Sequence, residues 1–191
     1  GSACRSAGAC WFSTCFWMCS HWEVSRCTSR VSWSSVAPSA AVRTGRLSAD
    51  WVPDCVDLLL CAHAHIYIEA GARAKARLGA LGYHPSLLPR HRGRDAVRWA
   101  IHMGDKVTGG SAYWMDDGAD TGPIAAQEWC WIQPGDTPAE LWRRDLAPMG
   151  LRLFETALSN IDRGASKAVP QLEAMATWEP SFTSKRLASA Q

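Results

Sequence analysis

Residues 56–62 read Val-Asp-Leu-Leu-Leu-Cys-Ala, an apolar run of the length of a β-strand. A strand with so few polar residues is typical of a sheet that is covered on both faces. Pro53 precedes the run, and proline cannot donate a hydrogen bond inside a central strand, so we expect the strand to begin after it. The run therefore predicts a layered fold built on a buried sheet.

Strand and helix patterns alternate after this run. The strands are expected over residues 80–83, 111–115 and 124–132. The helices are expected over residues 69–78 and 94–103. A further helix is expected to begin at Thr137 and Pro138 and to reach about residue 161, with a kink or break at Pro148. The alternation predicts an α/β fold with a mostly parallel, doubly wound, Rossmann-like sheet, which binds ligands beyond the carboxyl ends of its strands.

The composition excludes several classes of protein. The chain has 191 residues, of which 47% are hydrophobic and 20% are charged, and a net charge of +2. No apolar run reaches the roughly 18 residues that cross a bilayer, and the net charge is too small for general nucleic-acid binding. We therefore expect a cytoplasmic globular protein. His63 and His65 alternate at a strand end, but no third ligand is evident, so we expect no metal.

The first 49 residues differ in composition from the rest of the chain. They hold five of the eight cysteines, four tryptophans, five arginines and one acidic residue. We interpret residues 1–49 as an atypical segment, disordered or translated out of frame, followed by a domain over 50–180 and a flexible tail over 181–191. The alternatives are a signal peptide with its apolar core at residues 9–19 and a zinc site, whose ligands would be Cys15, Cys19, His21 and Cys27.

Two loops that follow predicted strands carry the residues with chemistry. Residues 83–93 read Tyr-His-Pro-Ser-Leu-Leu-Pro-Arg-His-Arg-Gly, and residues 116–124 read Asp-Asp-Gly-Ala-Asp-Thr-Gly-Pro-Ile. A histidine and a carboxylate on such loops can pair and donate a proton or hydrogen bond to a developing oxyanion. The residues alone leave open a purely structural pair. Arg90, Arg92, Arg94 and Arg98 form a local basic patch, which is either a solvated face or a contact for a phosphate.

Both loops resemble the signature of the formyltransferase family that uses 10-formyltetrahydrofolate. The strings His-Pro-Ser-Leu-Leu-Pro (84–89) and Asp-x-Gly-x-Asp-Thr-Gly-Pro-Ile (116–124) occur in the family order, with 36 residues from His84 to Asp120. The resemblance covers about residues 50–180, and Ala176-Thr177-Trp178 also look like family positions. The first loop is most similar to that of the hydrolase domain of formyltetrahydrofolate dehydrogenase.

The resemblance implies roles for individual residues. His84 corresponds to the catalytic histidine that hydrogen-bonds the formyl oxygen, and Asp120 to the aspartate that holds this histidine charged and relays protons. The cosubstrate, 10-formyltetrahydrofolate, would contact the backbone of Asp116, Asp117, Gly118 and Ala119. The other wall of its pocket would come from His63, Ala64, His65 and Ile66. The implied partners are the folate and a small amine or water, with no membrane and with tRNA as the one nucleic acid to consider.

Two departures from the family pattern keep alternatives open. Most of the transferases have asparagine two residues before the catalytic histidine, but this chain has Gly82, and the hydrolase branch also lacks the asparagine. Residues 1–49 do not resemble the strand–helix–strand unit that opens the family, so we expect the first strands to be missing. We predict a transferase that moves the formyl group to an amine. The alternatives are a hydrolase, a non-catalytic fragment, and a methionyl-tRNA formyltransferase, although the 71 residues after Asp120 leave no room for its tRNA-holding domain.

Overall fold

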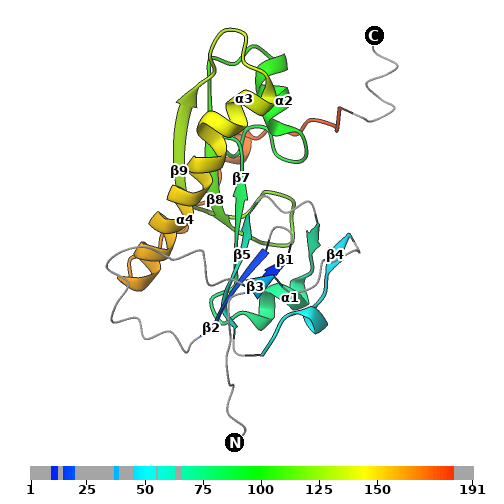
Figure 1. The fold of residues 1–191 in the computed structure, drawn as a ribbon, viewed down its shortest axis with the longest axis vertical. Coiled ribbons are helices and arrows are strands. Elements are labelled where there is room, and N and C mark those ends of the chain that lie inside the picture. Colours follow the sequence, from blue (N-terminus) through cyan, green and yellow to red (C-terminus); the bar gives the residue numbers. More distant parts are fainter. Residues whose placement is uncertain are drawn as a thin grey trace, which may run out of the picture. The chain divides into compact units, whose positions relative to one another are not determined.

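The computed structural model describes residues 10–12, 15–19, 37–38, 45–54, 56–62 and 66–182. The chain forms two compact units, Gly1–Gly82 and Tyr83–Gln191, which are described separately (Figure 1). Strands and helices alternate along the described residues, which confirms the α/β class. The described part of the chain has no helix that is long and apolar enough to span a membrane.

The first unit is built on β5 (Val56–Ala62), the strand predicted from the apolar run. Leu58 and Leu59 are almost completely buried. On one side of β5 the sheet continues with β2 (Cys15–Cys19), then β1 (Cys10–Phe12) and then β3 (Ala37–Pro38). β1 is parallel to β3, but β2 is antiparallel to both β1 and β5. The sheet is therefore mixed, where the sequence predicted a mostly parallel one.

Shorter elements complete this unit. β4 (Arg46–Leu47) pairs in parallel with β6 (Tyr67–Ile68), and the 3₁₀-helix Ala49–Trp51 lies next to α1 (Ala70–Lys75). The helix predicted over 69–78 ends at Lys75, because residues 77 and 78 form hydrogen bonds with β5 instead of continuing the helix. The amide groups of Arg77 and Leu78 donate to the carbonyl groups of Val56 and Asp57 in β5.

Several predictions concern residues that the structure does not describe. His63, Ala64 and His65 lie outside the described residues, as do His21 and Cys27 of the zinc alternative. Within the first 47 residues the described parts are β1 to β4 and Gly45. The three predicted segments, 1–49, 50–180 and 181–191, stay predictions.

The second unit contains an antiparallel pair, β8 (Val107–Trp114) and β9 (Ile124–Trp131), beside the end of β7 (Ala80–His84). β8 begins four residues earlier than predicted because two glycines allow close packing. A Cβ at Gly109 would overlap the Glu128 carbonyl oxygen, and one at Gly110 would lie 2.6 Å from the Tyr83 ring. Sequence propensity disfavours glycine in strands, but here the absent side chains make room for neighbours.

Helix α4 (Ala147–Asp162) packs on β8 and β9 (Figure 1). It follows α3 (Pro138–Leu141), which begins with a capping box between Thr137 and Glu140. The sequence predicted the helix start at Thr137 and Pro138, but not the part of Glu140 in the capping box. The predicted break at Pro148 takes the form of a π-helical turn over Trp142–Leu146, since proline has no amide hydrogen for the preceding turn. Tyr83 donates a hydrogen bond to the Leu146 carbonyl, 2.6 Å away, and burial raises the pKa of Tyr83 well above its usual value.

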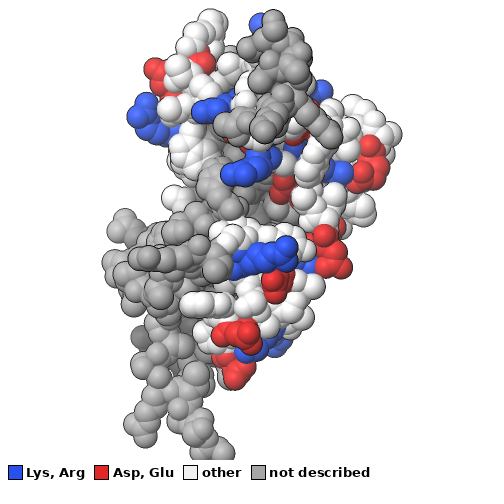
Figure 2. Space-filling view, turned by 90° about the vertical axis from the view of Figure 1, so that its right-hand side faces the viewer, with Lys and Arg blue, Asp and Glu red and all other residues white. Residues whose placement is uncertain are grey.

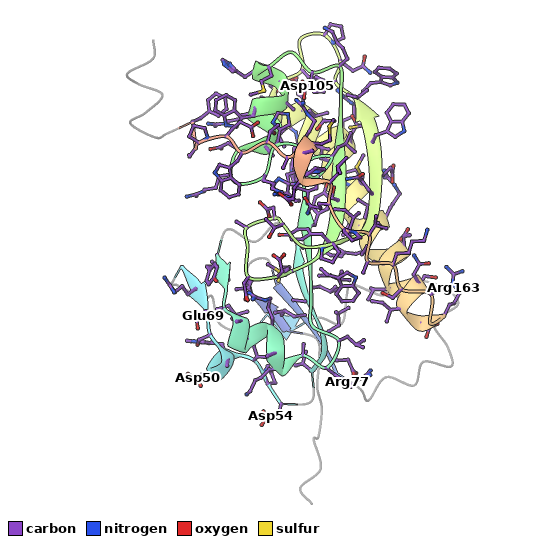
Figure 3. All side chains as sticks on the ribbon, turned by 180° about the vertical axis from the view of Figure 1, so that it is seen from behind. Asp50, Asp54, Glu69, Arg77, Asp105 and Arg163 are labelled. Atoms are coloured by element: carbon purple, nitrogen blue, oxygen red, sulfur yellow. The ribbon has the colours of Figure 1, made fainter. Side chains whose placement is uncertain are left out.

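The remaining helix, α2 (Ala96–His102), ends shortly before β8. Beyond α4 the chain returns as an extended segment, residues 169–182, which we call the strap. The 3₁₀-turn of the strap (Glu173–Met175) and α4 lie on opposite sides of the strands of this unit, as Figures 1 and 3 show. On the face seen in Figure 2, basic and acidic side chains of the described residues are interspersed.

Candidate functional site

His84 is the last residue of β7, and its side chain is 8% exposed. Its Nε2 lies 2.7 Å from the backbone carbonyl oxygen of His91, to which it can donate. Its Nδ1 lies 3.5 Å from Oδ2 of Asp120. Both contacts can be favourable together only when both ring nitrogens carry hydrogen. The loop therefore fixes the imidazole at one nitrogen and leaves a looser contact at the other.

Asp120 faces this looser contact from the loop between β8 and β9. Its Oδ2 accepts a hydrogen bond from the Gly93 amide at 2.8 Å, and its Oδ1 accepts one from the Tyr113 hydroxyl at 2.7 Å. The backbone of Asp120 has a φ of 57°, in the left-handed region that costs a non-glycine residue free energy. The carboxylate is thus held by groups from two other segments, so its position beside His84 is well determined.

The four residues before Asp120 are exposed. Asp116 Oδ1 accepts hydrogen bonds from the Gly118 amide at 3.0 Å and the Thr121 hydroxyl at 2.7 Å, which close a small turn. A Cβ at Gly118 would overlap the Thr121 hydroxyl, so the turn requires glycine there. The turn lies at the surface, and the folate contact predicted for it stays a prediction.

A second histidine cluster lies beside the site and was not predicted. His91, with a φ of 54°, has its Nε2 2.9 Å from Asp105 Oδ2 and its Nδ1 3.1 Å from Glu179 Oε1. The His91 Nδ1 and Glu179 Oε1 atoms are close enough for an ion pair but are not aligned for a hydrogen bond. The other carboxylate oxygen, Glu179 Oε2, is buried without a hydrogen-bond partner among the described residues. Asp105, labelled in Figure 3, follows α2. The cluster connects the first loop to the strap.

Arg92 is also buried, at 6% exposure, which corrects its placement in an exposed or ligand-binding basic patch. Its guanidinium donates to Gln171 Oε1 at 2.8 and 3.1 Å and to both carboxylate oxygens of Glu173. The hydrogen bonds between Arg92 and Glu173 raise the pKa of Arg92 and lower the pKa of Glu173. In the same patch Arg90 pairs with Asp105, whereas Arg94 and Arg98 are exposed.

The structure brings together one part of the predicted site. His84, Asp120 and the residues 116–119 lie in the second unit, and their proposed roles remain proposals. Ile66 is partly exposed in the first unit, and the rest of the predicted second wall lies outside the described residues. Sequence reasoning missed Tyr113, Gly93 and the strap residues that bond the loop. The one signal for the strap was the family-like Ala176-Thr177-Trp178.

The fold and the site define an α/β domain with a His–Asp pair on loops at strand ends. A model of the formyl transferase family matches residues 49–153, more than half of the chain. The chain therefore belongs to the formyl transferase family.

Among relatives, human mitochondrial 10-formyltetrahydrofolate dehydrogenase is 46% identical over 101 residues, which are 53% of this chain and 11% of that protein. Methionyl-tRNA formyltransferase of Methylacidiphilum infernorum is 36% identical over 121 residues, 63% of this chain and 37% of that protein. The chain thus spans about a tenth of the length of the dehydrogenases it matches.

Solved structures agree with this assignment. Glycinamide ribonucleotide transformylase 1 from Symbiobacterium toebii is 33% identical, with a TM-score of 0.53 over 57% of this chain and 51% of that one. HypX from Aquifex aeolicus, solved with tetrahydrofolic acid, has a TM-score of 0.61 over 66% of this chain and 22% of that one. Its 24% identity supports the shared fold alone.

Proposed function

We propose that this domain acts on the formyl group of 10-formyltetrahydrofolate and transfers it to an amine. The observation that carries the proposal is the His84–Asp120 pair, with Nδ1 and Oδ2 3.5 Å apart and the opposite ring nitrogen anchored on a carbonyl. A contact of this length leaves Nδ1 able to bond a substrate atom, since catalytic hydrogen bonds are often long before the substrate binds. Relatives named for 10-formyltetrahydrofolate support the choice of donor.

His84 would donate a hydrogen bond from Nδ1 to the formyl oxygen, where negative charge develops as the nucleophile adds to the formyl carbon. The bond from the formyl carbon to the folate nitrogen then breaks, and that nitrogen takes up, through water, the proton that the amine has lost. Asp120 would keep the imidazole oriented and accept the proton that the attacking amine loses, through water. The exposed turn Asp116–Ala119 would contact the heterocycle of the folate through its backbone.

Hydrolysis is a second candidate, with water in place of the amine. It is favoured by Gly82, which provides no side chain at the position of the second oxyanion donor, and by the relatives named 10-formyltetrahydrofolate dehydrogenase. Removing such a donor lowers a rate by about 10²–10³-fold unless another group replaces it. We further propose a cytoplasmic location, a folate and a small acceptor as partners, and a place in one-carbon metabolism.

The test is deformylation of 10-formyltetrahydrofolate by the purified chain, followed by absorbance, without an acceptor and with glycinamide ribonucleotide or methionyl-tRNA. We expect His84→Asn to abolish the reaction. The matched control is His102→Asn, the same replacement at an exposed histidine of α2, which should leave the rate unchanged. Turnover without an acceptor would identify a hydrolase. Absence of turnover under all conditions, with tetrahydrofolate binding also absent, would refute the proposal.

A further inference from the structure

The strap, residues 169–182, lies beyond the region that the family model matches, which ends at residue 153. It nevertheless contacts both loops of the site. Val169 exchanges two backbone hydrogen bonds with Ile124. The Thr177 amide donates to the Pro89 carbonyl, and the Thr177 carbonyl accepts from the Arg92 amide. The strap therefore connects the end of the Asp120 loop to the loop that follows His84.

Gln171 makes the most direct of these connections. Its Nε2 donates to the backbone carbonyl oxygen of Asp120 at 2.8 Å and to that of Gly122 at 2.7 Å. Its Oε1 accepts two hydrogen bonds from Arg92. Every polar atom of this amide is thus used, and the acceptor contacts assign the orientation of the side chain, with nitrogen toward the loop and oxygen toward the guanidinium.

The two carbonyl groups belong to the strained part of the site. Asp120 has a left-handed backbone, and such a conformation persists only where neighbouring groups hold it. Gly122 lies close to β8, since a Cβ at this position would overlap the Trp114 carbonyl oxygen. Gln171 therefore bonds the backbone on either side of Thr121 and resists rotation of the peptide that carries Asp120.

We propose that Gln171 is a positioning residue for the proposed reaction, acting through the backbone of Asp120. Arg92 fixes the amide of Gln171, and Glu173 in turn holds Arg92 with two further hydrogen bonds. Together with the hydrogen bonds from Gly93 and Tyr113, this chain of contacts sets the distance between the Asp120 carboxylate and His84. The inference rests on the proposed function for its catalytic consequence, but the placement of the loop can be measured without catalysis.

The informative variant is Gln171→Glu. It keeps the shape of the side chain and an acceptor for Arg92, but it places a carboxylate oxygen against two carbonyl oxygens. The matched control is Gln133→Glu, the same replacement at an exposed glutamine in the turn between β9 and α3. Both variants are made in the full chain.

Three quantities are compared: kcat, KM for 10-formyltetrahydrofolate, and amide hydrogen exchange of residues 116–122. For Gln171→Glu we expect kcat to fall about tenfold to hundredfold, as for a displacement near 1 Å, with KM changed less than about threefold. Exchange of the loop should accelerate while that of α4 and β9 does not, whereas the control should resemble the wild type.

Equal kcat values and equal loop exchange in the variant and the control would overturn the inference. A uniform acceleration of exchange over the whole unit would also overturn it, since this result indicates general destabilisation. If the wild type itself shows neither turnover nor tetrahydrofolate binding, the proposed function fails, and the exchange measurement alone decides whether Gln171 holds the loop.

Discussion

Asp120→Asn tests the central pair of the site with a nearly isosteric change. Both carboxylate oxygens now accept hydrogen bonds, one from the Gly93 amide and one from the Tyr113 hydroxyl. An asparagine has a single acceptor oxygen, so its nitrogen must face one of these donors. With the oxygen toward Gly93, the Tyr113 hydroxyl must turn and accept instead, which a hydroxyl group can do.

The expected cost follows from these two contacts. A hydrogen bond to a charged group contributes about 1.5–3 kcal/mol, and a neutral one about 0.5–1.5 kcal/mol. Replacing two charge-assisted bonds by neutral ones therefore lowers the free energy of unfolding by about 2 kcal/mol. The Asp120 side chain is only 17% exposed, so water compensates little of this loss.

The assay is urea unfolding of both proteins at pH 7, together with deformylation kinetics. We expect the midpoint to fall and kcat to drop by about 10²–10⁴-fold, because His84 loses its charged partner. Asp162→Asn removes the same charge from the exposed end of α4 and should change neither quantity. A stability loss below about 0.5 kcal/mol would show that the two hydrogen bonds do not form. Unchanged kcat would refute the role of the carboxylate.

Three further predictions concern the second unit. Arg144 donates hydrogen bonds to Asp136 and lowers the pKa of this carboxyl group, so the contribution of the pair to stability is present at neutral pH and is lost on acidification. The Asp136→Asn variant should therefore be less stable than the wild type at pH 7. The urea midpoints of the two proteins should converge as the pH falls below about 4. Gly122→Ala should lower the free energy of unfolding by about 1–3 kcal/mol, because its Cβ would overlap the Trp114 carbonyl; an unchanged melting temperature would contradict this contact. Tyr83→Phe should cost about 1–3 kcal/mol by chemical denaturation, since a buried carbonyl of the π-helical turn loses its donor, and a neutral result would mean that water replaces the hydroxyl.

Much of the fold could be predicted because local patterns agree with tertiary packing. The apolar run at β5, the Pro-flanked cap at Thr137 and the periodic helix α4 are all local signals, and the structure places the elements where these signals indicate. The start of β8 could not be predicted, since Gly109 and Gly110 oppose strand formation locally. Their requirement arises from Glu128 and Tyr83, which are distant in the sequence.

The candidate site also contains residues that local sequence patterns predict and residues that they do not. His84 and Asp120 could be identified because each lies in a contiguous string of residues that resembles a family signature. The groups that hold them have no such string: Tyr113 and Gly93 bond Asp120 through single atoms, and Gln171 reaches the same loop from 51 residues away. A lone glutamine in an extended segment has no periodicity or spacing that distinguishes it from a solvated loop residue.

Arg92 shows why charge alone misleads in this region. In the sequence it stands among four arginines within nine residues, a pattern that favours a solvated or anion-binding face. In the structure these arginines have different surroundings. Arg92 is buried against the strap and donates hydrogen bonds to Gln171 and Glu173, whereas Arg94 and Arg98 are exposed. Burying a guanidinium is favourable only when its donors are bonded, so Arg92 can be buried only where the strap is docked. The same residue that the sequence assigns to the surface therefore couples docking of the strap to the geometry of the Asp120 loop.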